Sequence, residues 1–215
     1  MTQIDPPNRY TRVDSGDDTR ERLLAAALSQ FAQRGFYGAS IAQIAGELDL
    51  TKQALLYYFK RKEDLYAEVL KRIAERLLTG MRAGVEPDAS PEGQFEAMIL
   101  GVYEAARANP DDVKVLMREL LEVHRSKANP DEWYLKTFLD DIVGRLDQIE
   151  GLAQRPFAEK FAGVFQILSA IEYFVAAGPT LTRFYGEEGV AEIEAAYPAQ
   201  LREQVRHLTQ CHGPH

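Results

Sequence analysis

A short run of residues that begins at Thr51 has the side-chain types needed to read the edges of DNA bases. Lysine donates hydrogen bonds to guanine and glutamine pairs with adenine, which suits Lys52 and Gln53 to base edges in the major groove. Ala54 and Leu56 fit against thymine methyl groups. If Thr51 begins a helix, the free N–H groups of its first turn also attract phosphate. The run therefore predicts contact with double-stranded DNA.

A second group of residues, directly after this run, suits the DNA backbone rather than the bases. Tyr57, Tyr58 and Lys62 can reach phosphate groups, which position a protein on DNA without specifying sequence. Lys62 closes a compact basic cluster at residues 60–62. With two residues of the preceding segment, the predicted DNA contacts are Ser40, Gln43, Thr51, Lys52, Gln53, Ala54, Leu56, Tyr57, Tyr58 and Lys62.

Short helices are needed to position these side chains, and the sequence predicts them. Helix starts are expected at Asp18, Ser40 and Thr51, the first two followed three residues later by Glu or Gln as in a capping box. Gly35 is expected to end the first helix. Only the tight turn at residues 48–50 separates the next two, as in a helix-turn-helix. Apolar residues recur at helical spacing elsewhere and strand signals are lacking, so we predict an all-α fold.

The sequence SIAQIAGELDLTKQALLYYFKRKEDLYAEVL, residues 40–70, resembles the DNA-binding head of the TetR family of bacterial repressors. The matching residues are Ser40, Ile44, Ala45, Leu50, Thr51, Lys52, Leu55, Tyr57, Tyr58, Phe59, Lys62, Glu63 and Leu65, with Phe31, Ala32, Gly35 and Phe36 upstream. The resemblance spans residues 18–70. It implies a three-helix head and a larger C-terminal helical domain for ligand binding and dimerisation.

Three residues depart from the family pattern. Asp49 stands at a turn position where members often carry glycine, and aspartate tolerates the unusual backbone angles of such a turn. Leu56 replaces a frequent tyrosine, which removes one familiar base contact. Arg61 stands where many members have a capping serine or asparagine. Its presence costs the helix about 1 kcal/mol and adds positive charge near the DNA backbone.

Composition and charge place the chain among globular proteins. Hydrophobic residues make up 46% and charged residues 27%, no run of about 18 apolar residues predicts a membrane span, and no apolar N-terminal stretch predicts a secretory signal. The single cysteine, Cys211, has no internal disulfide partner. The net charge is −8, yet residues 1–80 hold 12 Lys and Arg against 11 Asp and Glu, whereas residues 81–215 hold 13 against 22. The acidity therefore lies outside the predicted head, and we expect a cytoplasmic protein.

Three parts are expected along the chain. Residues 1–17 form a flexible N-terminal arm, residues 18–80 the helix-turn-helix domain with the start of a linking helix, and residues 81–215 the ligand-binding and dimerisation domain. A Gly- and Pro-rich segment marks the boundary after residue 80. The arm carries Arg9 and Arg12, and it is either a minor-groove contact or a disordered terminus.

The body repeats one helix-start pattern, a capping residue followed by proline, at residues 90–91, 109–110 and 129–130. Pro156 is expected to open a further helix that ends at Gly178-Pro179, and Pro198 is expected to break or kink the last helix.

The TetR resemblance also implies a role for the last two long helices. It implies that residues 158–177 and 188–208 pair between two subunits as a four-helix interface. The alternative for these residues is the ordinary core of a monomer.

Aromatic and apolar residues of the body are candidates for lining a small-molecule pocket, with ordinary core packing the alternative for each. The candidates are Tyr103, Met117, Leu121, His124, Trp133, Phe138, Phe165 and Tyr173. Glu172 interrupts an apolar helix, and it could lie at a pocket, at the dimer interface or in water. Water is the commonest place for a glutamate.

Catalytic motifs are missing from the sequence: there is no nucleophile elbow, phosphate-binding glycine loop, paired-His zinc motif or dinucleotide fingerprint. We therefore expect no enzyme, no cofactor and no metal site. The resemblance implies a homodimeric repressor that binds a palindromic operator and is released by an unidentified small-molecule effector. Two alternatives stay open: a DNA-binding dimer without effector control, serving nucleoid organisation or a protein partner, and a helical enzyme with its active site in the body.

Overall fold

A computed structural model of the chain describes residues 16–121 and 134–210. Within these ranges all regular structure is helical, which confirms the predicted all-α class. The elements are α1 (Gly16–Gly38), α2 (Ile41–Gly46), α3 (Lys52–Tyr58), α4 (Lys62–Arg82), α5 (Pro91–Ala108), α6 (Pro110–Leu121), α7 (Tyr134–Gly144), the short 3₁₀ helix η3 (Arg145–Gln148) and α8 (Phe157–Thr209). The predicted helix start at residues 129–130 and the N-terminal arm lie outside the described residues.

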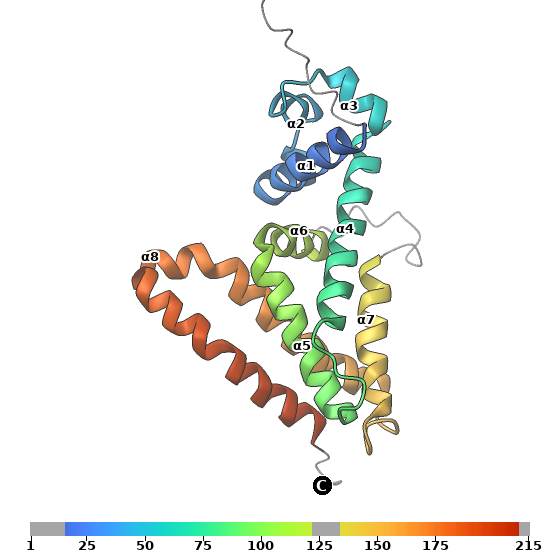
Figure 1. The fold of residues 1–215 in the computed structure, drawn as a ribbon, viewed down its shortest axis with the longest axis vertical. Coiled ribbons are helices and arrows are strands. Elements are labelled where there is room, and N and C mark those ends of the chain that lie inside the picture. The colour runs from blue at the N-terminus through green and yellow to red at the C-terminus, as the bar shows by residue number, and fades with distance from the viewer. Residues whose placement is uncertain (1–15, 122–133, 211–215) are drawn as a thin grey trace, which may run out of the picture.

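The helices form a small head and a larger body that share one long helix (Figure 1). Helices α1, α2 and α3 make up the head, and α4 begins in the head and continues into the body between α5 and α7. Helix α6 lies across the end of the body and packs against α1. Helix α8 folds back on itself as two arms: the first starts against the body and leads out to a bend, and the second returns from this bend toward α5.

The head is held together by apolar side chains that lie on the inner faces of its helices. These are fully or almost fully buried: Leu23, Ala27 and Phe31 of α1, Ile44 and Ala45 of α2, Leu55 of α3, Phe59, and Leu65 of α4. Phe31 and Phe36 both contact the ring of Tyr66 edge-on, at centroid distances of 4.8 and 5.2 Å. Such edge-to-face pairs add directional packing to the apolar contacts. The start of α4 is therefore fixed to the rest of the head.

Helix ends in the head follow the sequence prediction with two exceptions. Helix α1 begins at Gly16, so the predicted start with a capping box at Asp18 is wrong, and Asp18 lies in the first turn of the helix. Thr51 caps α3 as expected, because its Oγ1 accepts a hydrogen bond from the Ala54 N–H at 3.2 Å. Gly35 breaks α1 as predicted, with φ at 67°, although one further turn of helix follows it. The predicted capping box at Ser40 is wrong: Ser40 precedes α2, but its side chain makes no capping hydrogen bond. Gln43 instead accepts a hydrogen bond from Arg34.

Helix α8 corrects two further expectations. The predicted helix end at Gly178-Pro179 is wrong, and so is the predicted break at Pro198, because both prolines lie inside α8. A proline removes only one N–H donor from the helical ladder, and the neighbouring bonds carry the helix past it. The chain changes direction at Gly186 instead, where φ is 73°. Glycine adopts this left-handed conformation without the steric cost that a Cβ brings.

Candidate functional site

Helix α3 presents one face to solvent while its other face is locked into the head. Leu55 is completely buried and Phe59, just after the helix, is 4% exposed. Lys52 and Gln53 are exposed, and Tyr57 is 83% exposed, which is unusual for a large aromatic side chain. The buried anchors fix the helix, so that the exposed side chains project from a rigid support.

The turn before α3 sets the angle between α2 and α3. Asp49 adopts a left-handed conformation with φ at 57°, the only positive φ at a residue other than glycine in the described part of the chain. The Leu50 N–H reaches back to the Ala45 carbonyl at 3.0 Å and closes the turn. Aspartate is among the residues that tolerate this conformation. The tight turn predicted from the sequence therefore forms with aspartate in the place of glycine.

Polar contacts brace α2 against α1. Arg34 donates from Nη1 to Gln43 Oε1 at 3.2 Å, and the Gln30 amide donates to the carboxylate of Glu47. Gln43 is exposed, so its bond with Arg34 orients a side chain that still faces solvent. Ser40, next to the start of α2, is half-buried.

Basic and aromatic side chains surround the junction between α3 and α4. Lys62 Nζ lies 4.5 Å from the centre of the Phe36 ring, and Tyr57 and Tyr58 contact each other edge-on at 5.3 Å. Arg61 is exposed and pairs with Asp64 at 2.7 Å, and this hydrogen bond lowers the pKa of the Asp64 carboxyl group. The basic cluster at residues 60–62 is thus partly compensated within the head.

The ten residues predicted to contact DNA lie on α2, on α3, in the segments next to these helices and at the first residue of α4. Five of them are exposed, namely Gln43, Thr51, Lys52, Gln53 and Tyr57, and five are half-buried, namely Ser40, Ala54, Leu56, Tyr58 and Lys62. The structure brings them together at the end of the molecule farthest from the body (Figure 1). Leu56, which departs from the family pattern, lies in the half-buried group.

Comparison with known proteins agrees with this geometry. A model of the family described as bacterial regulatory proteins, tetR family, matches residues 23–69, which span α1 to α4 up to Val69. The chain belongs to the TetR family. The matching family and its neighbours are transcriptional regulators rather than enzymes, in agreement with the expectation from the sequence.

Individual relatives extend the match beyond the head to different degrees. The HTH-type transcriptional regulator RutR of Escherichia coli (strain K12) is 35% identical over 102 residues, which cover 47% of this chain and 48% of RutR. The HTH-type transcriptional repressor NicS of Pseudomonas putida is 30% identical over 141 residues, 64% of each chain. The match to RutR thus spans about half the length of either protein.

A solved structure shows a similar fold over most of the chain. The structure of a TetR-like transcriptional regulator from Rhodococcus sp. RHA1 superposes with a TM-score of 0.66 and 19% sequence identity, covering 93% of this chain and 100% of the other. At this level of identity the likeness establishes the fold alone. The body therefore shares its helical fold with that regulator.

A narrow cavity lies inside the TetR body, between α4, α5, α6, α7 and the first arm of α8. Its free volume is about 30 Å³, which is room for about two water molecules. Each of the five helices contributes apolar side chains, among them Leu77, Val102, Leu116, Phe138 and Leu168. Among the described residues that line it, only Ser169 and Glu172 carry polar side chains. The lining resembles that of small-molecule sites, but the volume is far below the roughly 300–1,000 Å³ of such sites.

The residues predicted from the sequence to line a pocket are dispersed. Phe138 and Phe165 line the cavity. Tyr103 is buried beside Phe174 and Tyr197, Met117 is half-buried on α6, and Leu121 and Tyr173 are 78% and 70% exposed. His124 and Trp133 lie outside the described residues. For Glu172 a pocket, the dimer interface and water were all left open, and the residue lies in the cavity lining.

Helix α6 connects this cavity with the head. Leu116 and Leu120 line the cavity. From the same helix, Arg118 donates to the carbonyl oxygens of Ala32 and Gln33 at 3.3 and 3.4 Å, and Glu119 accepts a hydrogen bond from the Tyr66 hydroxyl at 2.8 Å. The carbonyl groups of Ala32 and Gln33 are near the break at Gly35, where helical acceptors lose their usual partners.

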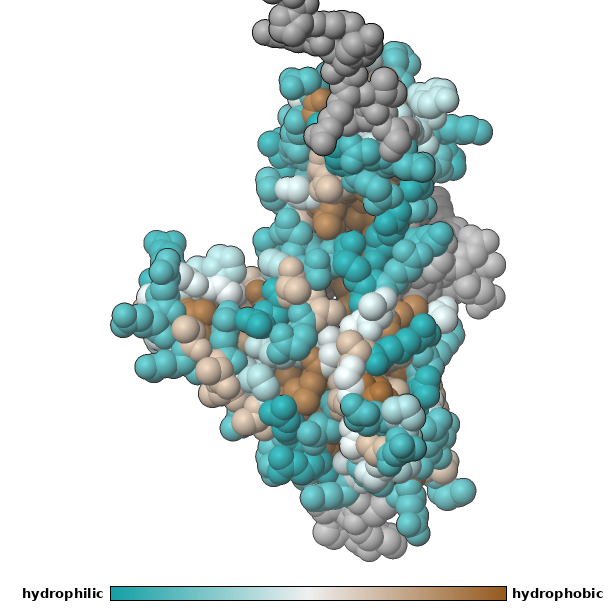
Figure 2. All heavy atoms as spheres, viewed as in Figure 1, coloured by the Kyte–Doolittle hydropathy of each residue, from teal (hydrophilic) through white to brown (hydrophobic). Residues whose placement is uncertain are grey.

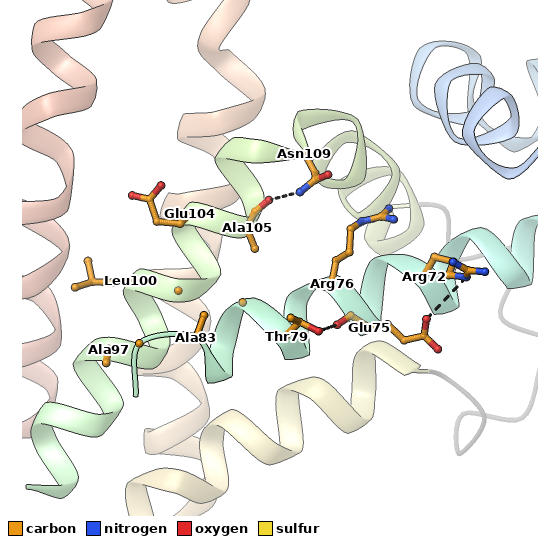
Figure 3. A pocket seen from close by; sticks show the side chains of 13 residues that line it. Arg72, Glu75, Arg76, Thr79, Ala83, Ala97, Leu100, Glu104, Ala105 and Asn109 are labelled. Carbon is orange, nitrogen blue, oxygen red and sulfur yellow. Dashed lines mark hydrogen bonds and ion pairs between the residues drawn. The ribbon is translucent and has the colours of Figure 1, made fainter. Parts of the chain in front are cut away.

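A larger, open hollow lies between α4 and α5, and Figure 3 shows its lining. Its polar groups are already engaged: Asn109 donates to the Ala105 carbonyl at 2.9 Å, Thr79 donates to the Glu75 carbonyl at 2.8 Å, and Arg76 binds a carboxylate of α6. Small residues, including Ala83 and Ala97, make up much of the remaining lining (Figure 3). The narrow body cavity is therefore the better candidate for a ligand site.

The described residues also bear on metal binding and on membrane insertion. Among residues 16–121 and 134–210, no group of His, Cys, Asp and Glu is arranged to hold a metal ion. Helix α8 is long and apolar enough to cross a membrane by length and composition, with a window of mean hydropathy 1.5. Its inward side chains, such as Val164 and Ile171, are buried against the body.

Several residues of the site escaped the analysis of the sequence. Arg118 and Glu119 join α6 to the head, and only their neighbours Met117 and Leu121 were considered. Leu116 and Leu120 were missed because leucine on a helix is equally typical of core packing. For Glu172 a signal existed: it lies seven residues after Phe165 and four after Leu168, which places all three on one face of a helix.

Proposed function

We propose that this TetR-family chain is a DNA-binding transcriptional regulator whose head reads an operator through α3. One observation carries the proposal: the exposed side chains Lys52, Gln53 and Tyr57 project from a short helix whose other face is anchored by Leu55 and Phe59. A rigid helix with an exposed N-terminal half fits the major groove, where bases present distinct donors and acceptors. Access to DNA implies a cytoplasmic location.

The ten predicted contacts divide into two roles. Lys52 and Gln53 are the candidates for hydrogen bonds with base edges, and Ala54 and Leu56 for contacts with thymine methyl groups. Ser40, Gln43, Thr51, Tyr57, Tyr58 and Lys62 are the candidates for phosphate contacts that position the head.

The exposed apolar face of α8 supports a homodimer. Only 22% of its most apolar stretch is buried within one chain, and Tyr173, Phe184 and Tyr185 are each more than half exposed. Figure 2 shows apolar residues at the surface along the arms of α8, at the left of the view. Large apolar surfaces of this kind are usually covered by a partner. We infer that residues 158–177 and 188–208 pair with a second copy and place two heads about 34–36 Å apart, one turn of DNA.

Effector control is supported by the position of α6. A molecule in the body cavity would press on Leu116 and Leu120, and α6 would transmit this to the head through Arg118 and Glu119. A ligand shifts the equilibrium between two states of the dimer only to the extent that it binds one state more tightly than the other. The proposed outcome is a dimer whose heads are wrongly spaced for a palindromic operator, so that repression ends.

Selection of random double-stranded DNA on the purified full-length chain tests the proposal. Enrichment of an inverted repeat, with half-sites one helical turn apart, is the expected result. Binding of the selected DNA is then measured at two salt concentrations, because phosphate contacts make affinity fall with salt.

Two other results are informative. Weak binding without sequence preference would contradict the operator-binding function and favour nucleoid organisation or a protein partner. An inverted repeat that no cavity ligand releases would leave a DNA-binding dimer without effector control.

A further inference from the structure

The end of α1 and the start of α2 form a corner of the head that consists of Arg34, Tyr37, Ser40 and Gln43. Only two residues separate the two helices, so these side chains belong to one compact turn. The sequence predicts DNA contacts for Ser40 and Gln43 and no role for the other two. Arg34 and Tyr37 are both exposed, and the corner therefore carries a cation and an aromatic hydroxyl group that the contacts of α3 do not explain.

Arg34 differs from the arginines that hold α1, α3 and α4 together. Arg20, Arg61 and Arg72 each pair with a carboxylate. Among the described residues Arg34 pairs with no carboxylate, and its polar contact is the hydrogen bond from Nη1 to Gln43 Oε1 at 3.2 Å. A guanidinium group has five N–H donors and is always charged, so most of these donors lack an acceptor within the described chain. The charge of Arg34 is therefore available to an anion outside it.

The ring of Tyr37 is anchored on a buried aromatic side chain. Tyr37 is 69% exposed, and its ring contacts the Phe36 ring edge-on at 5.4 Å between centroids. Phe36 is buried, and Lys62 Nζ lies 4.5 Å from the centre of the same ring. Tyr37 and Lys62 thus border one aromatic side chain, which places Tyr37 near a residue proposed to contact phosphate.

We propose that Arg34 and Tyr37 bind the sugar-phosphate backbone of the operator beside the groove that α3 enters, with Gln43 holding the guanidinium group in place. The proposal rests on the function proposed above, because it adds a second contact surface to the same head. In a helix-turn-helix the second helix lies in the major groove while the first crosses the backbone. Gln43 belongs to that first helix, α2, so the guanidinium group bonded to it lies beside the crossing point.

A phosphate group fits this corner better than a base edge does. The planar guanidinium group presents parallel N–H donors that match the oxygens of phosphate. Side chains outside the recognition helix mostly meet phosphate and sugar, and tyrosine hydroxyl groups are among the usual donors. An acidic protein partner would offer Arg34 the same charge, but DNA affinity would then be indifferent to Arg34.

DNA titrations of two Arg34 variants at several salt concentrations test the proposal. Arg34→Gln removes the charge and keeps an amide that can still donate to Gln43. Its affinity for the selected operator and for unrelated DNA should fall by the same factor, roughly ten-fold, and the slope of affinity against salt should lose about one unit. Arg34→Lys keeps the charge. It should keep the slope and recover only part of the affinity, because an ammonium group lacks the planar set of donors.

A third variant and a control separate the hydroxyl group and the net charge from the site. Tyr37→Phe keeps the ring against Phe36 and should weaken both DNAs about three-fold, the value of one neutral hydrogen bond. Its salt slope should not change, because an uncharged group releases no counterion. Arg82→Gln is the matched control: Arg82 is exposed at the body end of α4, and its loss changes the net charge by the same amount. Affinity and slope should stay as in the unchanged chain.

Three results would overturn the backbone contact. These are an Arg34→Gln variant that binds both DNAs like Arg82→Gln, a loss confined to the operator, and an Arg34→Lys variant whose salt slope falls as in Arg34→Gln. Circular dichroism and urea unfolding of each variant show whether the head is still folded. If Arg34→Gln is unstable, the slopes of Arg34→Lys and Tyr37→Phe and the affinity of Tyr37→Phe decide.

The titrations also distinguish this inference from the proposed function. If the unchanged chain binds its operator and Arg34→Gln binds it equally well, the regulator stands and the corner is not a contact. If the unchanged chain binds DNA without sequence preference and Arg34→Gln weakens that binding, the backbone contact stands and the operator-reading function fails. A chain that binds no DNA at low salt contradicts both.

Discussion

Arg76 and Asp112 form an ion pair with two hydrogen bonds between α4 and α6. The Nε and Nη2 atoms of Arg76 each donate to one carboxylate oxygen of Asp112 at 2.6 Å. The Asp112 side chain is 5% exposed and that of Arg76 is 38% exposed. Burial raises the pKa of Asp112 more than Arg76 lowers it, so the pair compensates the buried carboxylate only in part. The pair therefore joins α4, which continues from the head into the body, to α6, which contacts the head.

Removing Arg76 alone is predicted to destabilise the body strongly. Arg76→Leu leaves the Asp112 carboxylate buried without a partner, which costs about 3 kcal/mol. The double variant Arg76→Leu with Asp112→Leu removes both charges and is expected to recover much of that loss. Urea unfolding of the three proteins measures the difference. Equal losses in the single and double variants would contradict the view that the unpaired carboxylate is the cause.

Gly101 is predicted to be essential to the contact between α4 and α5. A Cβ at this position would lie 2.0 Å from the Gly80 carbonyl oxygen, a backbone atom that cannot move aside without its helix. Gly101→Ala is therefore expected to lower the free energy of unfolding by about 2 kcal/mol or more, as overpacking does. Gly144→Ala is the control, because a Cβ there meets nothing within 4 Å. If both variants unfold at the same urea concentration, the two helices separate more easily than the geometry indicates.

The exposed face of α3 is predicted to carry the affinity for operator DNA. Lys52→Ala and Tyr57→Ala are expected to weaken binding of the selected operator at least ten-fold, the loss of one good base or phosphate contact. Neither side chain packs in the core, so the helical content and the dimer should be unchanged. Lys71→Ala, which removes a charge from α4 in the region between head and body, serves as control. Unaltered operator binding by both α3 variants would mean that another surface reads the DNA.

Lys62 is predicted to position the head without reading sequence. Its ammonium group lies over the Phe36 ring at the start of α4. Lys62→Ala should weaken operator and unrelated DNA by the same factor and reduce the salt dependence by about one unit. Titrations of both DNAs at several salt concentrations measure this. A loss confined to the operator would assign Lys62 to base recognition instead.

The head could be predicted from the sequence in detail because its signals are local. The Thr51 cap, the turn at Asp49 and the break at Gly35 each depend on a few neighbouring residues, and all three form as expected. The capping box at Ser40 failed since Gln43 found a partner on another helix, Arg34, which lies close only after folding. Local patterns are reliable where no tertiary contact competes with them.

The body was less predictable because its features depend on contacts between distant helices. Pro179 and Pro198 are strong local breakers, yet α8 runs through both and bends at Gly186, which the sequence does not distinguish from other glycines. The cavity lining comes from five helices, so residue type alone could not separate Phe138, which lines it, from Tyr173, which is exposed. The position of Glu172 likewise follows from the packing of α6 and α7 against α8.

Glu172 is predicted to make the stability of the chain depend on pH. Its pKa is about 7 in the folded chain, whereas an unfolded glutamate titrates near its ordinary value of 4.5. Between these two values the folded chain holds a proton that the unfolded chain has released, so the free energy of unfolding falls as the pH rises and levels off above about pH 7.

The free energy of unfolding of Glu172→Gln should not fall in this way, because glutamine does not ionise. Relative to wild type it should gain about 2 kcal/mol across this window, allowing for partial contact with solvent. Urea unfolding at several pH values measures the difference, and Glu159→Gln should follow wild type throughout. A constant difference between Glu172→Gln and wild type at every pH would show that the pKa of Glu172 is the same in the folded and the unfolded chain, and would contradict this prediction.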